Sequence, residues 1–290
     1  MGRKFKAATL QFEVDPTSIQ HNLSIAEELL EEAASEGAEL AVFPEYCWTA
    51  YANPQLAEQV PYGPTSTRLG EFARKHSMYI ASGSLVEKDQ DGMYLTSVLL
   101  GRDGALLGKH RKTSLVGADL EVKLEGKSVV GMKDEIGAGI CAGSKLDPIR
   151  AELGNLGILL GAELDVPEAA RTLVMKGAEI LLASVSFETR WVEDISFLGQ
   201  ARAYENSAYL IVANRSGSWD SPEGFLTYGG GSAIMSPLGE MMCTVGRRTS
   251  KGIAVATIDL DLLREVRKSF NILSLRNSRA YILTSTSYMY

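Results

Sequence analysis

Apolar strands and amphipathic helices alternate along most of this 290-residue chain, and this order restricts the fold more than any other feature of the sequence. A short apolar run predicts a buried strand, whereas apolar residues that recur every three or four positions predict a helix. Segments of these two kinds follow one another in both halves of the chain: Lys4–Val14, Ile19–Ala33, Leu40–Glu45, Leu156–Leu160, Pro167–Lys176 and Glu179–Ala183. The β-α-β order predicts an α/β protein in which helices cover largely parallel strands.

The two halves are joined by an irregular segment, Val116–Arg150, and by no low-complexity linker. We therefore expect one domain over residues 1–290, made of two packed α/β halves, and not two separable domains. A further helix is expected over Trp191–Ser207, directly before a strand over Ala208–Ala213.

The charge of the chain argues against nucleic acid and membranes as partners. The formal net charge is −7 and the isoelectric point is about 5.2, whereas a nucleic-acid surface needs clustered lysine and arginine. The N-terminus lacks the apolar core of a signal peptide, and no later segment reads as a membrane span. The cysteines Cys47, Cys141 and Cys243 form no motif, which favours a cytoplasmic location with reduced thiols.

Metal and cofactor motifs are absent from the sequence. The histidines His21, His76 and His110 are isolated from one another and from the cysteines, so we expect no metal site. The glycine-rich runs Gly137–Gly143 and Gly229–Ser232 lack the strand-loop-helix context of a phosphate-binding loop. We therefore expect no metal and no cofactor.

Three charged residues are candidates for chemistry, although each taken singly is better explained as a solvated surface charge. Glu45 follows a buried strand, where partial desolvation would make its carboxylate more basic, as a general base requires. Lys112 follows another strand and could place a fixed positive charge over a developing oxyanion. Glu135 lies in the irregular joining segment.

The order of several short motifs changes this interpretation. The chain contains, in sequence, FPE ending at Glu45, RKxxL around Lys112, a strand leading to xxExxxPE ending at Glu168, then KGAEILL, an NRSG turn and GGSAIMSPLGE. This series, from about Phe5 to Asp259, resembles the nitrilase superfamily of carbon-nitrogen hydrolases. The resemblance implies a four-layer α-β-β-α sandwich that commonly dimerises, and hydrolysis of small amides or nitriles through a cysteine thioester without a metal.

The same resemblance implies roles for individual residues. Glu45 corresponds to the general base, Lys112 to the lysine that stabilises the tetrahedral intermediate, and Glu135 to a second, supporting glutamate. We expect Glu45, Lys112 and residue 161 to converge on one pocket. The residues expected to border this pocket and contact the substrate are Tyr51, Ala162, Ser184, Ser186 and Phe187.

Gly161 stands where the superfamily has its cysteine nucleophile, because Pro167 and Glu168 fix the register of the motif. A glycine cannot form a thioester, and loss of a nucleophile usually costs many orders of magnitude in rate. Cys47 lies two positions after Glu45 and is a weak candidate for a substitute nucleophile. Cys141 is better explained as a small apolar residue.

Two explanations of Gly161 therefore stay open. In the first, a cysteine has been replaced deliberately in an amidase-like hydrolase, which is then inactive or nearly so. In the second, the protein is a natural non-hydrolytic member: a ligand-binding pseudoenzyme, or an enzyme that uses Glu45 and Lys112 for other acid-base or condensation chemistry. A homodimer or larger assembly is expected in either case, with contacts through the helices Glu168–Met175 and Trp191–Ser207.

Overall fold

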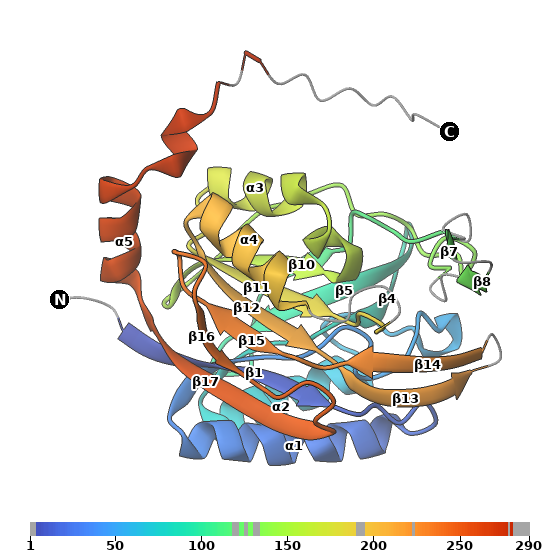
Figure 1. Ribbon diagram of the computed structural model, residues 1–290. Coiled ribbons are helices and arrows are strands. Elements are labelled where there is room, and N and C mark those ends of the chain that lie inside the picture. The colour runs from blue at the N-terminus through green and yellow to red at the C-terminus, as the bar shows by residue number, and fades with distance from the viewer. Residues whose placement is uncertain are drawn as a thin grey trace.

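The computed structural model describes residues 4–117, 122–124, 127–129, 134–189, 195–221, 224–277 and 279–280. Two large sheets lie face to face, and a pair of helices covers the outer face of each sheet (Figure 1). This arrangement is the four-layer α-β-β-α sandwich that the motif series implied, so the predicted fold class is confirmed.

The first sheet has the strand order β17-β1-β2-β3-β5-β4, and β6 pairs with β5. Strands β1, β2 and β3 are parallel neighbours because helices connect them across one face. The strands are β1 (Lys4–Phe12), β2 (Ala38–Val42), β3 (Tyr79–Ala81), β4 (Leu85–Asp89), β5 (Gly92–Leu100), β6 (Leu106–Arg111) and β17 (Lys251–Asp259), and the covering helices are α1 (Ile19–Ser35) and α2 (Pro64–His76).

The second sheet has the strand order β16-β15-β12-β11-β10-β9, and its central strands β10, β11 and β12 are parallel. The strands are β9 (Ile149–Ala151), β10 (Gly154–Leu160), β11 (Ile180–Val185), β12 (Tyr209–Asn214), β15 (Ala233–Met235) and β16 (Met241–Thr244), and the covering helices are α3 (Pro167–Met175) and α4 (Ser196–Asn206).

Burial explains why these segments take their places. Helix α1 begins after Ser18, whose hydroxyl accepts a hydrogen bond from the backbone N–H of His21 at 3.1 Å. Its buried residues, such as Leu23, Ala26 and Leu30, recur at helical spacing and pack on the first sheet. The central strands are buried on both faces, because one face meets the other sheet and the opposite face meets helices.

Several elements differ from the sequence-based prediction. Helix α4 begins at Ser196 within the described residues, while residues 190–194, including Trp191, lie outside them. The irregular segment contains short strands that were not predicted. A hairpin and a C-terminal helix elsewhere in the chain were not predicted either. These elements are β7 (Val122–Leu124), β8 (Lys127–Val129), β9, β13 (Ser216–Ser221), β14 (Gly224–Gly229) and α5 (Leu260–Ser269), and the short 3₁₀ helices are η1 (Pro54–Leu56), η2 (Gly161–Leu164) and η3 (Ile272–Leu275).

The fold brings several strand ends to one region. Strands β2 and β11 run parallel to both of their neighbours, and β10 runs parallel to β11. The segments that follow β2, β6, β10 and β11 carry Glu45, Lys112, Gly161 and Ser186. Open α/β sheets commonly bind ligands beyond the carboxyl ends of parallel strands. Within the part of the chain that the structure describes, no helix has the length and apolar character needed to cross a membrane.

Candidate active site

A buried lysine lies between two buried glutamates at the centre of the site. The Nζ atom of Lys112 lies 2.8 Å from Oε1 of Glu45 and 2.6 Å from Oε1 of Glu135, and none of the three side chains is more than 1% exposed. The structure therefore brings together the three charged residues that the sequence selected. The expectation that each, taken singly, is a solvated surface charge is wrong for all three.

Backbone hydrogen bonds fix the segments that carry these charges. The N–H of Lys112 donates to the carbonyl of Leu95 at 2.8 Å, directly after β6. The N–H of Glu45 donates to the carbonyl of Val185 at 3.2 Å, which joins the segment after β2 to the end of β11 in the other sheet. The N–H of Glu135 donates to the carbonyl of Val116 at 2.9 Å. The positions of the three side chains thus depend on both sheets.

The charge of Lys112 is stable at neutral pH. Burial alone would lower the pKa of this lysine, but the charges of Glu45 and Glu135 and their hydrogen bonds outweigh burial and raise it above its ordinary value. Glu135 also accepts hydrogen bonds from the hydroxyl of Tyr46 and from the backbone N–H of Val116, the latter at 2.9 Å. Glu135 therefore holds Lys112 in place, and burial together with Glu135 raises the pKa of Tyr46 so that its hydroxyl stays protonated.

Glu45 is the carboxylate that faces the position of the expected nucleophile. Its Oε2 accepts a hydrogen bond from the hydroxyl of Ser186 at 2.8 Å, while its Oε1 accepts one from Lys112. An ideal Cβ built on Gly161 would lie 2.3 Å from Oε1 and 2.7 Å from Oε2 of Glu45. The carboxylate of Glu45 therefore occupies space that a side chain at residue 161 would need.

Gly161 begins the turn η2 with a φ of +50°, a left-handed conformation that side chains other than glycine adopt at a cost. This turn follows β10 directly and ends just before α3. Residue 161 thus lies buried at a sharp turn between a strand and a helix. The glycine offers a backbone N–H and carbonyl at this position, but no nucleophilic atom.

Glu163 holds the turn in place, although the motif series assigned no chemical role to this residue. Its carboxylate accepts hydrogen bonds from the backbone N–H of Leu160 at 2.8 Å and from the backbone N–H of Thr113 at 2.6 Å, and it contacts Nε2 of His110 at 2.8 Å. Burial would raise the pKa of Glu163, but its hydrogen bonds from His110 and Thr113 lower it. Glu163 thus connects the Gly161 turn to the segment that carries Lys112.

The five residues expected to contact substrate differ in their surroundings. The hydroxyl of Ser186 donates a hydrogen bond to Glu45. The hydroxyl of Ser184, in contrast, is buried and has no hydrogen-bond partner in the described part of the chain. Tyr51 is 38% exposed and its ring stacks on Trp219 of β13 at a centroid distance of 5.5 Å. Ala162 lies half-buried within η2. Phe187 is half-buried, and its backbone N–H donates to Asn214.

The cysteines do not replace the missing nucleophile in this arrangement. Cys47 is buried in the core between α1, α2 and the first sheet, its Sγ lies 3.9 Å from the carbonyl of Ser82, and burial raises the pKa of its thiol. Burial likewise raises the pKa of Cys243 to about 11. Cys141 is exposed, and its backbone N–H donates to Met93.

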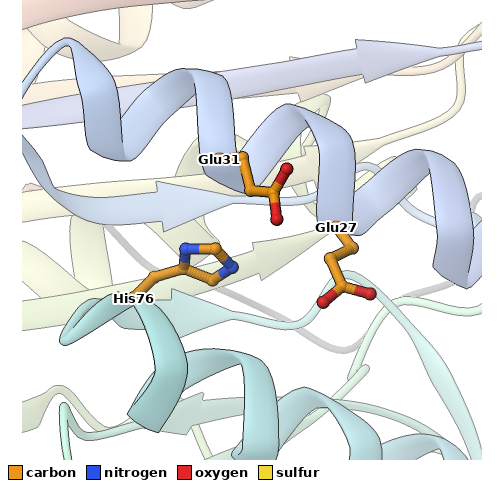
Figure 2. Close-up of side chains that lie close together, drawn as sticks. All are labelled: Glu27, Glu31 and His76. Carbon is orange, nitrogen blue, oxygen red and sulfur yellow. The ribbon is translucent and has the colours of Figure 1, made fainter.

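A group of potential metal ligands lies on the outer helical layer, on α1 and α2. Figure 2 shows Glu27 and Glu31 of α1 facing His76 at the end of α2, with their ligand atoms within 4.8 Å of one another. His76 thus lies beside two glutamates of α1, and His110 contacts Glu163. The Nζ of Lys75 lies 2.7 Å from Glu27 and 2.9 Å from Glu31, so a lysine already neutralises these carboxylates.

The arrangement around Lys112 can polarise a carbonyl or nitrile group and move a proton. The lysine supplies a fixed positive charge in a buried setting, where such a charge interacts strongly. Glu45 supplies a carboxylate that can accept a proton, and Glu135 keeps the lysine in position. Covalent catalysis would in addition need a nucleophilic atom at residue 161.

Comparisons with known proteins agree with this geometry. The sequence profile of the carbon-nitrogen hydrolase family matches residues 6–268. The omega-amidase NIT2 of Bos taurus is 31% identical over 281 residues, which cover 96% of each chain, and that of Xenopus tropicalis is 29% identical over 282 residues, covering 96% of this chain and 97% of the relative.

Solved structures show the same fold. A carbon-nitrogen hydrolase from Helicobacter pylori G27 superposes with a TM-score of 0.81 at 24% identity, covering 96% of this chain and 97% of the other. Saccharomyces cerevisiae Nit3, a member of branch 10 of the nitrilase superfamily, superposes with a TM-score of 0.78 at 20% identity, with the same coverage. This chain belongs to the carbon-nitrogen hydrolase family.

Proposed function

We propose that this chain binds a small amide at the centre formed by Glu45, Lys112 and Gly161, on a scaffold built for amidase-like hydrolysis of a C–N bond. The family and the omega-amidase relatives support amide chemistry over nitrile chemistry. As written, the chain hydrolyses such an amide slowly or not at all. The observation that carries this proposal is that the Glu45 carboxylate lies where a Cβ at residue 161 would be, so that the nucleophile position faces the base and holds no thiol.

The geometry defines what each group would do if a thiol stood at residue 161. Glu45 would take the thiol proton while the sulfur attacks the amide carbon, and Lys112 would stabilise the negative oxygen that forms. The C–N bond would break as Glu45 returns the proton to nitrogen, which leaves as ammonia. Water would then hydrolyse the thioester by the same base. Without the thiol, the remaining groups bind the amide and polarise its carbonyl.

One observation favours the second candidate function, a natural non-hydrolytic member of the family. The Glu45 carboxylate fills the space beside Gly161 and is held there by Lys112 and Ser186 at 2.8 Å each. A site that has lost only a CH2–SH group would retain room for the missing side chain. In this candidate function, Glu45 and Lys112 bind a ligand or carry out a different acid-base reaction.

Restoring the thiol separates the two functions. The variant Gly161→Cys is screened for ammonia release from small amides and nitriles, with Gly161→Ala as the control that adds a Cβ and no thiol. Ammonia release by the cysteine variant alone supports the hydrolase scaffold. Limited iodoacetamide treatment and peptide mapping report whether residue 161 is alkylated faster than Cys47, Cys141 and Cys243. Absence of both ammonia and preferential alkylation favours the non-hydrolytic function.

We also propose a homodimer of single-domain subunits. The core between the sheets contains residues from both halves of the chain, which favours one domain over residues 1–290. Helices α3 and α4 lie on one outer face, where Met175, Phe197 and Tyr204 are 53%, 59% and 46% exposed. Large apolar side chains exposed together are typical of an interface. A monomeric mass in light scattering would contradict the dimer.

Free cysteines support a cytoplasmic location.

A further inference from the structure

Ser186 contacts the base of the site through a group that can itself act as a nucleophile. The residue directly follows β11 and is buried, and its hydroxyl donates a hydrogen bond to Oε2 of Glu45 at 2.8 Å. A serine is activated as a nucleophile when its hydroxyl lies within hydrogen-bond reach of a base that a third group orients. Lys112 is the third group here, because its Nζ lies 2.8 Å from Oε1 of the same carboxylate.

Backbone hydrogen bonds hold residue 186 beside the base. The N–H of Glu45 donates to the carbonyl of Val185 at 3.2 Å, which joins the segment after β2 to the residue before Ser186. The N–H of Phe187, the residue after it, donates to Oδ1 of Asn214 at 2.9 Å. Residue 186 is therefore fixed on both sides, and its hydroxyl reaches Glu45 from the end of a strand of the second sheet.

The glycine at residue 161 allows this contact. An ideal Cβ on Gly161 would lie 2.7 Å from Oε2 of Glu45, the oxygen that accepts the hydrogen bond from Ser186. A side chain at residue 161 would thus push the carboxylate away from its present partners. Residues 161 and 186 follow β10 and β11, which are parallel neighbours in the second sheet. A nucleophile can therefore reach the same base from the next strand end when residue 161 has no side chain.

Two buried cations lie near this carboxylate. Lys112 bonds to Glu45 directly, and Arg215, which follows β12, lies near Glu45 as well. The Nη1 of Arg215 donates to the carbonyl of Ala50 at 2.8 Å, and its guanidinium lies 4.0 Å from the centre of the Tyr228 ring. Both cations favour a negative oxygen that forms at this site, and they act strongly because water is excluded.

We infer that Ser186 is a nucleophile for small carboxylic esters. Its Oγ attacks the carbonyl carbon while Glu45 takes the hydroxyl proton, and Lys112 stabilises the oxyanion of the tetrahedral intermediate. The C–O bond to the leaving group then breaks, Glu45 gives the proton to the leaving oxygen, and the acyl group stays on Ser186. Water attacks this acyl group with Glu45 again as the base, the serine oxygen takes the proton back, and a carboxylic acid is released.

Esters are the substrate class that a serine and a carboxylate suit. An amide nitrogen must receive a proton before it can leave, whereas an aryl oxide leaves readily as an anion. A nucleophilic atom at residue 161 is thus required for the thioester route to amides, while ester cleavage can begin at residue 186. The inference rests on the proposed function only for the position of the carbonyl oxygen beside Lys112, and it does not require an amide to bind.

The test uses the full chain with two probes. Hydrolysis of p-nitrophenyl acetate is expected to begin with a burst of about one p-nitrophenol per chain, as an acyl-enzyme gives. An alkyl fluorophosphonate forms a stable bond to an activated serine with loss of fluoride, and peptide mapping is expected to locate this label on Ser186. Absence of the label from Ser186, or acetyl groups found only on other residues such as the exposed Cys141, overturns the inference.

Three variants locate the activity. Ser186→Ala is expected to lower the rate of ester hydrolysis at least about hundredfold and to abolish the fluorophosphonate label. Ser97→Ala is the matched control, because it removes another buried hydroxyl, one without a hydrogen-bond partner in the described part of the chain, and both signals are expected to persist. Ser186→Cys keeps a nucleophile beside Glu45 and is expected to be acetylated at residue 186. Hydrolysis by Ser186→Ala at the rate of the unmodified chain overturns the inference.

Calorimetry with butanamide separates a failure of this inference from a failure of the proposed function. A chain that binds the amide but takes no label at Ser186 retains the proposed amide site and loses the serine nucleophile. A chain that is labelled at Ser186 but binds no amide supports the serine nucleophile and contradicts the proposed function.

Discussion

Substitution of Gly161 by alanine tests whether the active site is packed around the glycine. The new Cβ would lie 2.3 Å and 2.7 Å from the two carboxylate oxygens of Glu45, well inside contact distance. The Glu45 carboxylate must therefore move, although Lys112 and Ser186 each hold it at 2.8 Å. Alanine must also adopt a φ of +50°.

The two costs can be separated with a matched glycine. Left-handed backbone costs a residue with a Cβ about 1–2 kcal/mol, and loss of one hydrogen bond to a charged group costs about 1.5–3 kcal/mol. Gly37 has a φ of +78°, and a Cβ built there would approach no atom closer than the Lys6 side chain at 3.9 Å. Gly37→Ala thus carries the backbone cost alone, and both variants change the entropy of the unfolded chain equally.

Urea unfolding measures the difference. We expect Gly161→Ala to lower the free energy of unfolding by about 1.5–3 kcal/mol more than Gly37→Ala, with unchanged m-values. In a Glu45→Ala background the extra loss is expected to disappear, because the contact is gone. A difference below about 0.5 kcal/mol between the two glycine variants would show that Glu45 does not occupy this space, and it would remove the support for a site adapted to glycine.

Two further predictions concern charge. Lys112→Met leaves the buried carboxylates of Glu45 and Glu135 without their cation, so a loss of stability of about 3–5 kcal/mol at neutral pH is expected in urea unfolding. Glu163→Gln is expected to cost about 2–4 kcal/mol at pH 7. The pKa of Glu163 is lowered in the folded state, so its contribution is lost as the pH falls, and the deficit of this variant should shrink below about pH 4.

The sequence predicts the layered fold well because helical and strand periodicities reflect burial directly. Leu23, Ala26 and Leu30 of α1 recur at helical spacing and are buried against the first sheet, and Leu156–Leu160 is buried within β10. The hairpin of β13 and β14 was missed because β13 is polar and rich in serine, and β14 has only four residues between two glycines, so neither strand shows the alternation that marks a half-buried strand.

The sequence was sufficient to predict which residues form the site, but not the hydrogen bonds between them. The motif series selected Glu45, Lys112 and Glu135. In the structure, the Nζ atom of Lys112 lies within 2.8 Å of a carboxylate oxygen of each glutamate. The role of Glu163 depends on a contact with His110, 53 residues earlier, and no local pattern reveals such a contact. Because burial and pairing are properties of the folded chain, a carboxylate that holds a turn cannot be distinguished in sequence from one on the surface.

Glu45 and Gly161 have to be considered together. In a thioester mechanism the base and the nucleophile need separate positions within hydrogen-bond distance, so the base must leave room for the side chain that it deprotonates. Here the base is turned onto the glycine, and its two oxygens are held by Lys112 and Ser186. A thiol introduced at residue 161 must therefore displace Glu45 from at least one of these partners before the pair can act. The rate that Gly161→Cys recovers thus measures how far the base can move, and a variant that binds amides but releases ammonia slowly is the result expected of a site adapted to glycine.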